Sequence, residues 1–412
     1  MAPRELTPRR PWRGRRVVLG VSGGIAAYKS VQVARDLTRL GCVVDVVLTE
    51  GATRFVQPLS FEGVTGRPVH THLFQTDGAA LHIRLGQDAD AVCVAPATAD
   101  LLARAAQGRA DDLLTTTLLV TRAPVVLCPA MNTAMWEHPQ TAANVRHLAD
   151  VLGYRIAGPG TGALAHGEAS GAGRMLEPDD IVAHVGRALE SPGPLHGRSV
   201  LITAGPTREP LDPVRYLGNR SSGRMGWALA EAAWRRGAEV TLIAGPTALP
   251  DPVGVRVERV ERAEEMLEAA SHHVPHADVL IFAAAVADYR PRSPAAQKLK
   301  RERGAPTVDT VENPDVAASL TPLRKSGSFA VGFALETEDL VERARGKLAR
   351  KGFDLIVANP ADEPDAGLDV ETNRATLVAA DGSIEAVALM PKTELAELIL
   401  DRVGAARSRL PA

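Results

Sequence analysis

The residues best suited to chemistry stand in short polar segments that follow apolar runs, beginning with Gly23 and Gly24. The two glycines come directly after the apolar run 16–21 and before a segment with helical spacing. Glycines at such a turn allow close approach to the backbone, and the free N–H groups at the start of a helix bind anions. The motif is not the G-x-G-x-x-G of dinucleotide sites, so a tight turn without a ligand is the alternative at this point.

Two more polar loops of the first half, residues 96–100 and 129–132, also follow apolar runs. Together with the glycine turn they could surround a phosphate and a planar ring. His82 lies in an apolar setting, where a histidine is either a packed or surface residue or a catalyst. Residues 158–175 hold six glycines, which suits either a mobile flap or a plain flexible loop.

The second half has its own candidate phosphate-binding segments. Residues 205–207 (Gly-Pro-Thr) follow an apolar run, and residues 221–223 (Ser-Ser-Gly) precede a helical pattern, so both can offer donors to phosphate. Lys298 opens a basic run whose alternative is a solvated charged surface. Lys347 and Lys351 are four residues apart on an expected helix, so both can face one anion.

Alternating strands and helices must position these groups. Short apolar strands separated by helical patterns predict parallel βαβ units and a doubly wound sheet in each half. In such sheets ligands bind beyond the carboxyl ends of the strands, where the polar loops stand. In the first half we expect strands at Arg16–Val21, Val43–Leu48, Ala91–Ala95 and Val125–Cys128 and a helix at Ala26–Leu40.

A proline- and glycine-rich stretch divides the chain, and the pattern then starts again. We expect a disordered basic lead-in at residues 1–15, a domain at 16–190, a linker at 191–197 and a second domain at 198–412. Asp381 and Gly382 stand between two alternating runs and predict a hairpin, followed by a helix from about Lys392 to Val403. The second-half strands are expected at Ser199–Thr203, Glu239–Ala244, Val279–Ala283, Ala330–Phe333 and Leu355–Ala358, with a helix at Trp227–Arg236.

Composition excludes several classes of function. The formal net charge is −2 and only 4% of residues are aromatic, which argues against a nucleic-acid partner. The apolar runs are too short to cross a membrane. Cys42, Cys93 and Cys128 lie in or beside apolar strand patterns without paired spacing, which indicates reduced cysteines in a cytoplasmic protein and no Cys/His metal cluster.

Five segments of the first half occur together and in one order: GVSGGIAAYK, LHIRLG, APATADLLARAAQGRADDLLTTTLL, PAMNTAMW and a glycine-rich stretch ending in GRM. This set resembles the flavin-containing cysteine decarboxylase family. The resemblance implies an α/β flavodoxin-like or Rossmann-like domain with FMN, a catalytic His82 and an Asn132 that binds the substrate carboxylate. Arg174 is expected at the substrate phosphate, with a flap salt bridge as its alternative. The implied FMN contacts are Gly24, Ile25, Ala26, Thr49, Ala97, Thr98, Ala99, Asp100 and Ala130.

The chemistry that the resemblance implies explains the need for a flavin. A carboxylate leaves only if the remaining carbanion is stabilised, and oxidation of the thiol-bearing carbon to a thioaldehyde supplies that stabilisation. The reduced flavin then returns the hydride and 4′-phosphopantetheine forms. His166 stands where the family flap carries the cysteine that protonates the enethiolate. Either His166 donates this proton, or the flap is shifted and another group or water donates it.

The second half carries ITAGPTREPLDPVRYLGNRSSGRMG, AAAVADYRP, KLK, ENPDV and VGFALET. This set resembles the phosphopantothenate–cysteine ligase family, which implies a Rossmann-like domain with an added hairpin. The implied reaction joins 4′-phosphopantothenate and L-cysteine through an acyl-cytidylate, using CTP with Mg²⁺. Asn219 matches the asparagine that handles the acyl-cytidylate, and Lys298 matches a lysine of a loop that closes over the reacting groups. The implied CTP contacts are Asp288, Pro314, Asp315, Val316, Ala317, Phe333, Lys347 and Lys351.

The combined order resembles the bifunctional family of bacterial coenzyme A biosynthesis, whose decarboxylase acts on 4′-phosphopantothenoylcysteine. It implies trimeric decarboxylase domains and dimeric ligase domains. One alternative is an active ligase fused to a decarboxylase-like domain that is regulatory or releases the unreduced enethiol. A second alternative is a tandem NAD oxidoreductase, but this sequence lacks the G-x-G-x-x-G motif expected of one. The sequence leaves CTP and ATP undistinguished.

Overall fold

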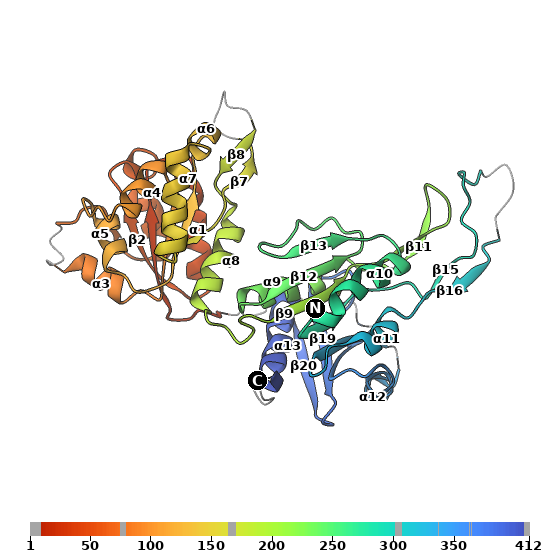
Figure 1. Cartoon of the computed structure of the whole chain (residues 1–412). Coiled ribbons are helices and arrows are strands. Elements are labelled where there is room, and N and C mark those ends of the chain that lie inside the picture. Colours follow the sequence, from red (N-terminus) through yellow and green to blue (C-terminus); the bar gives the residue numbers. More distant parts are fainter. Residues whose placement is uncertain are drawn as a thin grey trace. The chain divides into compact units, whose positions relative to one another are not determined.

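The computed structural model describes residues 10–74, 80–163, 170–300, 307–336, 338–361, 363 and 365–407. The chain forms two compact units, and the boundary between them falls between Ser191 and Pro192. Both units combine a largely parallel sheet with covering helices (Figure 1). This confirms the predicted α/β class for each half.

The first unit is built on a six-stranded sheet in the order β3-β2-β1-β4-β5-β6. All its strand pairs are parallel, with Val17 of β1 opposite Val44 of β2 and Ala91 of β4. This order is the Rossmann arrangement, in which the chain reverses direction across the sheet between β1 and β4. Its strands are β1 (Arg16–Val21), β2 (Val43–Leu48), β3 (Val69–His70), β4 (Ala91–Ala97), β5 (Val125–Pro129) and β6 (Arg155–Ile156).

Helices cover both faces of this sheet, which explains why its central strands are apolar on both sides. Val17 and Leu19 of β1 pack with α1, α2 and α8 in one core. Val18 of β1 and Val92 of β4 pack with α3, α4 and α5 in a second core on the other face. The remaining elements of the unit are α1 (Ala27–Arg39), η1 (Ala52–Arg54), α2 (Pro58–Thr65), α3 (Leu81–Gln87), α4 (Ala99–Ala106), α5 (Leu113–Val120), α6 (Thr133–Trp136), α7 (Pro139–Arg146), η2 (His147–Val151), β7 (Gly160–Gly162), β8 (Gly171–Arg174) and α8 (Pro178–Leu189).

Trp12 belongs to the folded unit although it falls in the segment expected to be disordered. Its side chain is only 4% exposed and packs in the core beneath α1 and α8. The indole Nε1 donates a 3.0 Å hydrogen bond to Glu190, and the backbone N–H donates to the carbonyl of Leu40. Packed structure therefore begins before the expected boundary at residue 16.

The second unit contains an eight-stranded sheet in the order β13-β12-β9-β14-β17-β18-β19-β20. The strands are parallel up to β18, and β19 and β20 add the predicted antiparallel hairpin at one edge. Gly382, in the turn of this hairpin, has a φ of 88°, which a glycine adopts without strain. The strands are β9 (Ser199–Ala204), β12 (Glu239–Ala244), β13 (Arg256–Arg259), β14 (Val279–Phe282), β17 (Phe329–Glu336), β18 (Leu355–Pro360), β19 (Thr372–Ala379) and β20 (Ile384–Pro391).

Helices α10, α11 and α12 pack on one face of this sheet, and α9 lies against α13 on the other (Figure 1). Two short antiparallel pairs, β10–β11 and β15–β16, extend from the sheet. Within the described residues no helix is both long and apolar enough to cross a membrane. These elements are α9 (Arg224–Arg235), α10 (Ala263–His273), η3 (Val274–His276), α11 (Val316–Leu320), η5 (Thr321–Leu323), α12 (Leu340–Lys351), α13 (Lys392–Arg407), β10 (Arg208–Pro210), β11 (Tyr216–Gly218), β15 (Tyr289–Pro291) and β16 (Thr310–Glu312).

Candidate functional sites

The first unit has a cleft of about 940 Å³ at the carboxyl ends of β1, β2, β4 and β5. This is where a doubly wound sheet binds ligands. The cleft brings together most of the residues expected to contact a cofactor or substrate. Those that line it are Gly24, Ile25, Ala26, Thr49, Thr98, Ala99, Asp100, Ala130, Asn132 and Arg174.

The start of α1 offers the cleft a set of backbone donors. No side chain caps this helix. No described residue accepts a hydrogen bond from the N–H groups of Gly24, Ile25 or Ala26. Unpaired N–H groups at the start of a helix, reinforced by its dipole, suit a phosphate.

The glycine pair of this turn serves two different purposes. A Cβ on Gly23 would lie 2.6 Å from the backbone carbon of Gly51, so this glycine allows the loops after β1 and β2 to touch. A Cβ on Gly24 would meet only Thr98 Cγ2, at 3.6 Å, so its surroundings are open toward the cleft. Ser22 joins the loops after β1 and β4, since its hydroxyl accepts from the Thr98 N–H at 3.1 Å. The cleft floor is therefore fixed by contacts within the protein.

Asn132 stands at the N-terminus of α6, where its side-chain oxygen accepts a 2.8 Å hydrogen bond from the N–H of Ala134. This cap fixes the amide group and directs its use. Since the oxygen is engaged, the NH₂ group, which no described residue accepts from, is available to an anionic group in the cleft. The geometry fits the expected carboxylate contact.

Arg174 is held by Glu177, whose carboxylate accepts a 2.5 Å hydrogen bond from its guanidinium. The same Glu177 oxygen accepts from the ammonium of Lys29 at 3.0 Å, and Lys29 is buried. The Lys29 hydrogen bond and charge, with Arg174, lower the pKa of Glu177 despite partial burial. The expected alternative for Arg174, a salt bridge at the flap, is thus present in this state. Arg174 also lines the cleft, so a ligand phosphate could exchange with Glu177.

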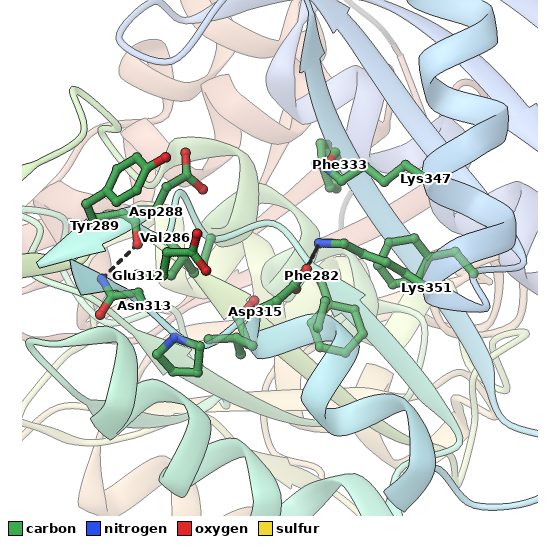
Figure 2. Close-up of a pocket in the computed structure, with 17 residues that line it drawn as sticks. Phe282, Val286, Asp288, Tyr289, Glu312, Asn313, Asp315, Phe333, Lys347 and Lys351 are labelled. Atoms are coloured by element: carbon green, nitrogen blue, oxygen red, sulfur yellow. Dashed lines mark hydrogen bonds and ion pairs between the residues drawn. The ribbon is translucent and has the colours of Figure 1, made fainter. Parts of the chain in front are cut away.

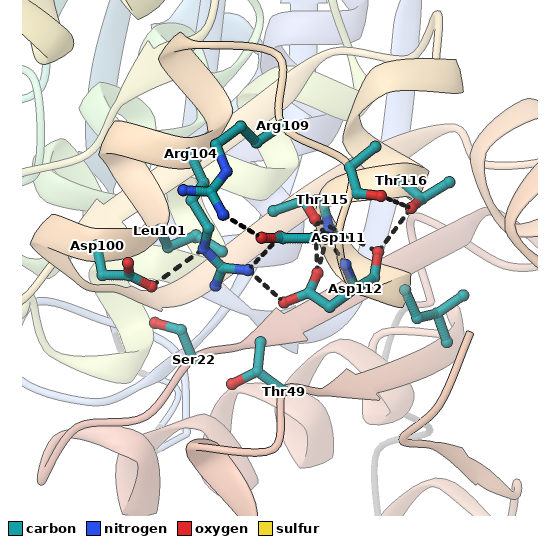
Figure 3. A network of polar contacts seen from close by, with 12 residues as sticks. Ser22, Thr49, Asp100, Leu101, Arg104, Arg109, Asp111, Asp112, Thr115 and Thr116 are labelled. Carbon is teal, nitrogen blue, oxygen red and sulfur yellow. Dashed lines mark hydrogen bonds and ion pairs between the residues drawn. The ribbon is translucent and has the colours of Figure 1, made fainter. Parts of the chain in front are cut away.

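A cluster of three aspartates around Arg104 lines the same cleft, and of its four members only Asp100 is expected from the sequence. Arg104 pairs with Asp100 at 3.0 Å, Asp111 at 2.9 Å and Asp112 at 2.7 Å. Figure 3 shows Arg104 between Asp100 on one side and Asp111 and Asp112 on the other. Asp112 also caps α5 through Thr115. Burial disfavours the Arg104 charge, but the hydrogen bonds that Arg104 donates to Asp112 and Asp111 outweigh it and raise the pKa of Arg104. The run ADD in the sequence was the available signal.

Three expected residues are not placed in the cleft. Ala97 ends β4 and is fully buried beneath it. His82 lies in the first turn of α3 and does not line the cleft of its own chain. His166 lies outside the described residues, so its role stays a prediction.

The second unit has a cavity of about 410 Å³ beside the carboxyl ends of β9, β14 and β17. It gathers all eight expected nucleotide contacts. Figure 2 shows Asp288 and Tyr289 on one side, Phe333 and Lys347 on another, and Asp315 between them. The eight are Asp288, Pro314, Asp315, Val316, Ala317, Phe333, Lys347 and Lys351.

The two lysines of α12 differ in their partners. Lys347 donates a 2.7 Å hydrogen bond to the carbonyl of Phe333, and burial followed by the charge of Lys351 lowers its pKa. Lys351 forms an ion pair with Asp315 at 2.7 Å. Burial alone would raise the pKa of Asp315, but the Lys351 hydrogen bond and the Ala318 N–H lower it. The cavity thus presents two cations to a ligand, one of them already paired.

Other expected residues of the second unit lie outside this cavity. Asn219 and Lys298 are exposed and do not line it. Thr207 is fully buried and its hydroxyl accepts from the Ala287 N–H, so the 205–207 segment braces the fold rather than cradling a ligand in this cavity. Ser222 donates to the carbonyl of Leu368. No cluster of three or more potential metal-ligating His, Cys, Asp or Glu side chains occurs in the part of the chain that the structure describes.

Comparisons with known proteins cover both units. The Flavoprotein family profile matches residues 5–190, and the profile of the DNA/pantothenate metabolism flavoprotein C-terminal domain matches residues 195–406. The coenzyme A biosynthesis bifunctional protein CoaBC of Mycobacterium tuberculosis is 49% identical over 404 residues, 94% of this chain and 96% of the relative. CoaBC of Vibrio cholerae is 45% identical over 391 residues, 94% of this chain and 97% of the relative. The solved C-terminal domain of a CoaBC protein is 39% identical with a TM-score of 0.45, covering 52% of this chain and 98% of that one.

Proposed function

The chain belongs to the bifunctional coenzyme A biosynthesis family, and from this premise we propose how its two units divide the reactions. The chain is an enzyme with a flavoprotein decarboxylase domain and a ligase domain. In our proposal residues 198–412 condense 4′-phosphopantothenate with L-cysteine in the cytoplasm, using CTP. Residues 16–190 then decarboxylate the resulting 4′-phosphopantothenoylcysteine to 4′-phosphopantetheine. Residues 191–197 link the two domains.

We assign FMN to the cleft of the first unit. The cleft volume of about 940 Å³ is in the range of small-molecule sites. The unpaired N–H groups at the start of α1 suit the single phosphate of FMN, and Ala99 and Ala130 leave room for a flat ring. Bound FMN supplies a reversible hydride acceptor, which the decarboxylation of an unactivated carboxylate needs.

The residues of the cleft then have distinct tasks. The NH₂ group of Asn132, fixed by its cap, holds the substrate carboxylate and shields it from water. Arg174 binds the substrate phosphate by exchanging its bond with Glu177. The family match assigns proton transfer near the reacting carbons to His82 and, as the sequence predicts, reprotonation to His166 or to a group that replaces it.

We propose that a neighbouring copy of the chain completes the decarboxylase site. His82 does not line the cleft of its own chain. Beside the cleft, Ile25 is 65% exposed and Tyr28 63% exposed, which suits an interface between copies. A trimer, as the family resemblance implies, would bring His82 of one copy to the cleft of the next. For the ligase domain we propose a dimer on the family resemblance.

In the second unit the carboxylate of 4′-phosphopantothenate attacks the α-phosphorus of CTP and pyrophosphate leaves. The amino group of cysteine then attacks the acyl carbon of the acyl-cytidylate and CMP leaves. Lys347 and Lys351 would neutralise part of the triphosphate charge, and Mg²⁺ bound with the nucleotide would neutralise more of it. Lys298 and Asn219, which do not line this cavity, act on the reacting groups as the family match implies.

The observation that carries this proposal is the end-to-end similarity to bifunctional relatives, 49% identity over 94% of the chain. It disfavours a purely regulatory first domain or one that releases the unreduced enethiol. The test supplies purified protein with 4′-phosphopantothenate, L-cysteine, CTP and Mg²⁺ and identifies products by mass spectrometry. We expect 4′-phosphopantetheine and a flavin absorbance spectrum. Accumulation of 4′-phosphopantothenoylcysteine alone would reject the decarboxylase assignment and leave the ligase assignment intact.

A further inference from the structure

Leu299, the residue after Lys298, is held by hydrogen bonds at both its backbone N–H and its backbone carbonyl. Asp212 Oδ2 accepts a 3.0 Å hydrogen bond from the Leu299 N–H. Arg215 donates a 2.6 Å hydrogen bond to the Leu299 carbonyl. Asp212 and Arg215 are themselves joined by bonds of 3.0 and 2.5 Å. One ion pair therefore satisfies both hydrogen-bonding groups of a single residue, and we call this arrangement the Asp212–Arg215 clamp.

Asp212 is built as a rigid anchor. Its side chain is 0% exposed, and besides Arg215 and Leu299 it accepts from the backbone N–H groups of Val214 and Arg215 at 2.9 and 2.8 Å. The side-chain hydrogen bond from Arg215, together with the backbone donors, holds the pKa of this carboxyl far below its usual range despite desolvation. A buried carboxylate with this many donors is ionised and fixed in one orientation.

The clamp joins two segments that are distant in sequence, residues 211–215 and residues 295–299. Asp212 lies between β10 and β11, and β11 ends at Gly218, directly before Asn219. A second bond, from the Ala295 N–H to the Leu211 carbonyl at 3.0 Å, joins the same two segments. Asn219 in turn donates a 2.8 Å hydrogen bond to the carbonyl of Ala285, in the loop after β14. Asn219 and the Lys298 backbone are thus both attached to the β10–β11 pair.

Lys298 itself has no other restraint in the described part of the chain. Its side chain is exposed and its ammonium makes no hydrogen bond or ion pair with any described residue. A lysine has four rotatable side-chain bonds, so where its ammonium can reach depends on where its backbone is held. The backbone of the neighbouring Leu299 is that point of attachment.

We infer that Asp212, acting with Arg215 through the backbone N–H and carbonyl of Leu299, is a positioning residue that sets the place of Lys298 relative to Asn219. This deepens the proposed ligase function and rests on it, because it assumes that Lys298 acts on the reacting groups. Proximity and orientation make large contributions to rate, so a loosened backbone at Lys298 slows turnover more than it weakens nucleotide binding.

The test compares full-length wild type with Asp212→Asn, and with Asp212→Ala where it folds. Asparagine keeps the size of the side chain but loses the charge that orients Arg215. Leu299→Ala is the matched control, since it removes the side chain and keeps both peptide groups. Glu385→Gln removes the carboxylate of a bidentate pair with Arg402 elsewhere in the unit and controls for loss of an ion pair. Two readouts are amide hydrogen exchange at residues 296–300 and CTP-dependent pyrophosphate release.

We expect Asp212→Asn to speed amide exchange at Leu299 about tenfold or more and to lower kcat about tenfold, with the KM for CTP within about threefold of wild type. Both controls should match wild type in exchange and turnover. Unchanged exchange in a folded Asp212→Asn protein overturns the inference, whether turnover falls or not. Faster exchange with normal turnover also overturns it, because the clamp would then be structural only. If wild type releases no pyrophosphate, the proposed ligase function fails, while the exchange measurement still reports on the clamp.

Discussion

The ammonium group of Lys351 lies 2.7 Å from the carboxylate of Asp315, on the wall of the cavity assigned to the nucleotide. Lys347, one helical turn earlier, donates instead to a backbone carbonyl. A triphosphate that binds both lysines must replace a charged partner at Lys351 and only a neutral one at Lys347. The two lysines therefore contribute unequally, although their sequence spacing makes them look equivalent.

Lys347→Met should weaken nucleotide binding more than Lys351→Met. A charge-assisted hydrogen bond contributes about 1.5–3 kcal/mol, so we expect a rise of roughly 10- to 100-fold in the KM for CTP for Lys347→Met. The rise for Lys351→Met should be several-fold smaller. The variant loses a phosphate contact, but the nucleotide no longer has to break the Lys351–Asp315 ion pair in order to bind. Steady-state pyrophosphate release measures both.

Arg350→Met serves as the control for these two variants. Arg350 is an exposed cation of the same helix and does not line the cavity. Its KM should stay within about twofold of wild type, since an exposed charge outside the site contributes little. An equal effect of Arg350→Met and Lys347→Met would show that the helix acts only through its overall charge.

Asn132→Asp separates the capping role of this residue from its role in binding a carboxylate. Aspartate caps a helix as well as asparagine does, so the free energy of unfolding should change by less than about 0.5 kcal/mol. A second negative charge opposite the substrate carboxylate should lower decarboxylation by at least about 100-fold. Urea unfolding and the release of carbon dioxide from 4′-phosphopantothenoylcysteine measure the two effects. A large loss of stability with normal decarboxylation would assign Asn132 to capping alone.

Mixing two inactive variants tests whether His82 acts in the cleft of a neighbouring copy. His82→Asn and Asn132→Asp should each lack decarboxylase activity. When they are co-expressed, some interfaces combine the intact His82 of one copy with the intact Asn132 of the next. Random mixing should restore on the order of a quarter of wild-type activity. If both residues serve one chain, the mixture stays inactive.

Gly23→Ala should abolish flavin binding because it distorts the protein, not because it contacts the flavin. Its new Cβ would collide with the backbone of Gly51, so the loops after β1 and β2 must separate. The flavin absorbance of the purified protein and its melting temperature should both fall. Gly63→Ala is the control, because nothing lies within 4 Å of a Cβ there. Gly24→Ala should keep its thermal stability, because the new Cβ meets no protein atom closer than 3.6 Å. It should lose flavin, because this Cβ stands where Gly24 lines the cleft.

His184 should make the first unit sensitive to acid. Burial, and then the charges of Arg155 and Arg187, lower its pKa from 6.5 to about 4. The folded state keeps His184 neutral while the unfolded chain takes up a proton below pH 6.5, so this contribution to stability is complete above pH 6.5 and is lost as the pH falls toward 4. Between pH 7 and 4.5 the loss should be on the order of 2–3 kcal/mol.

His184→Gln should remove this part of the pH dependence. Urea unfolding at pH 7 and at pH 4.5, followed by near-ultraviolet circular dichroism, measures the difference. His147→Gln changes an exposed histidine of the same unit and should leave the pH dependence as in wild type. Equal acid sensitivity in wild type and His184→Gln would contradict the expected burial of a neutral imidazole.

The long strands could be predicted because their local pattern and their final environment agree. Val43–Leu48 and Glu239–Ala244 match their expected bounds, since both are apolar runs buried between helices. β3 has only two residues and β11 only three, too few for any periodicity. Their pairing depends on partners elsewhere in the chain, which a local pattern does not reveal.

The sites show the same division. The structure gathers many of the residues that the family motifs point to in two cavities, because most of those motifs lie in loops at the carboxyl ends of strands, and the roles of these residues stay predictions. The roles of 205–207 and of Asp212 could not be foreseen in this way. The Thr207 hydroxyl accepts a hydrogen bond from the Ala287 N–H instead of facing the cavity. The role inferred for Asp212 depends on its hydrogen bond with Leu299, 87 positions later. Such contacts exist only once the chain has folded.

Trp12 and Glu190 join the opening segment of the first unit to the end of its last helix. Because their hydrogen bond joins the two ends of the unit, the unit can be cut out or fused to another protein without exposing its core at either end. Any stand-alone decarboxylase made from this chain should therefore start upstream of the indole and stop after the carboxylate. A fragment that starts at residue 16 would lack Trp12. The resulting cavity beneath α1 would lower the stability of the fragment.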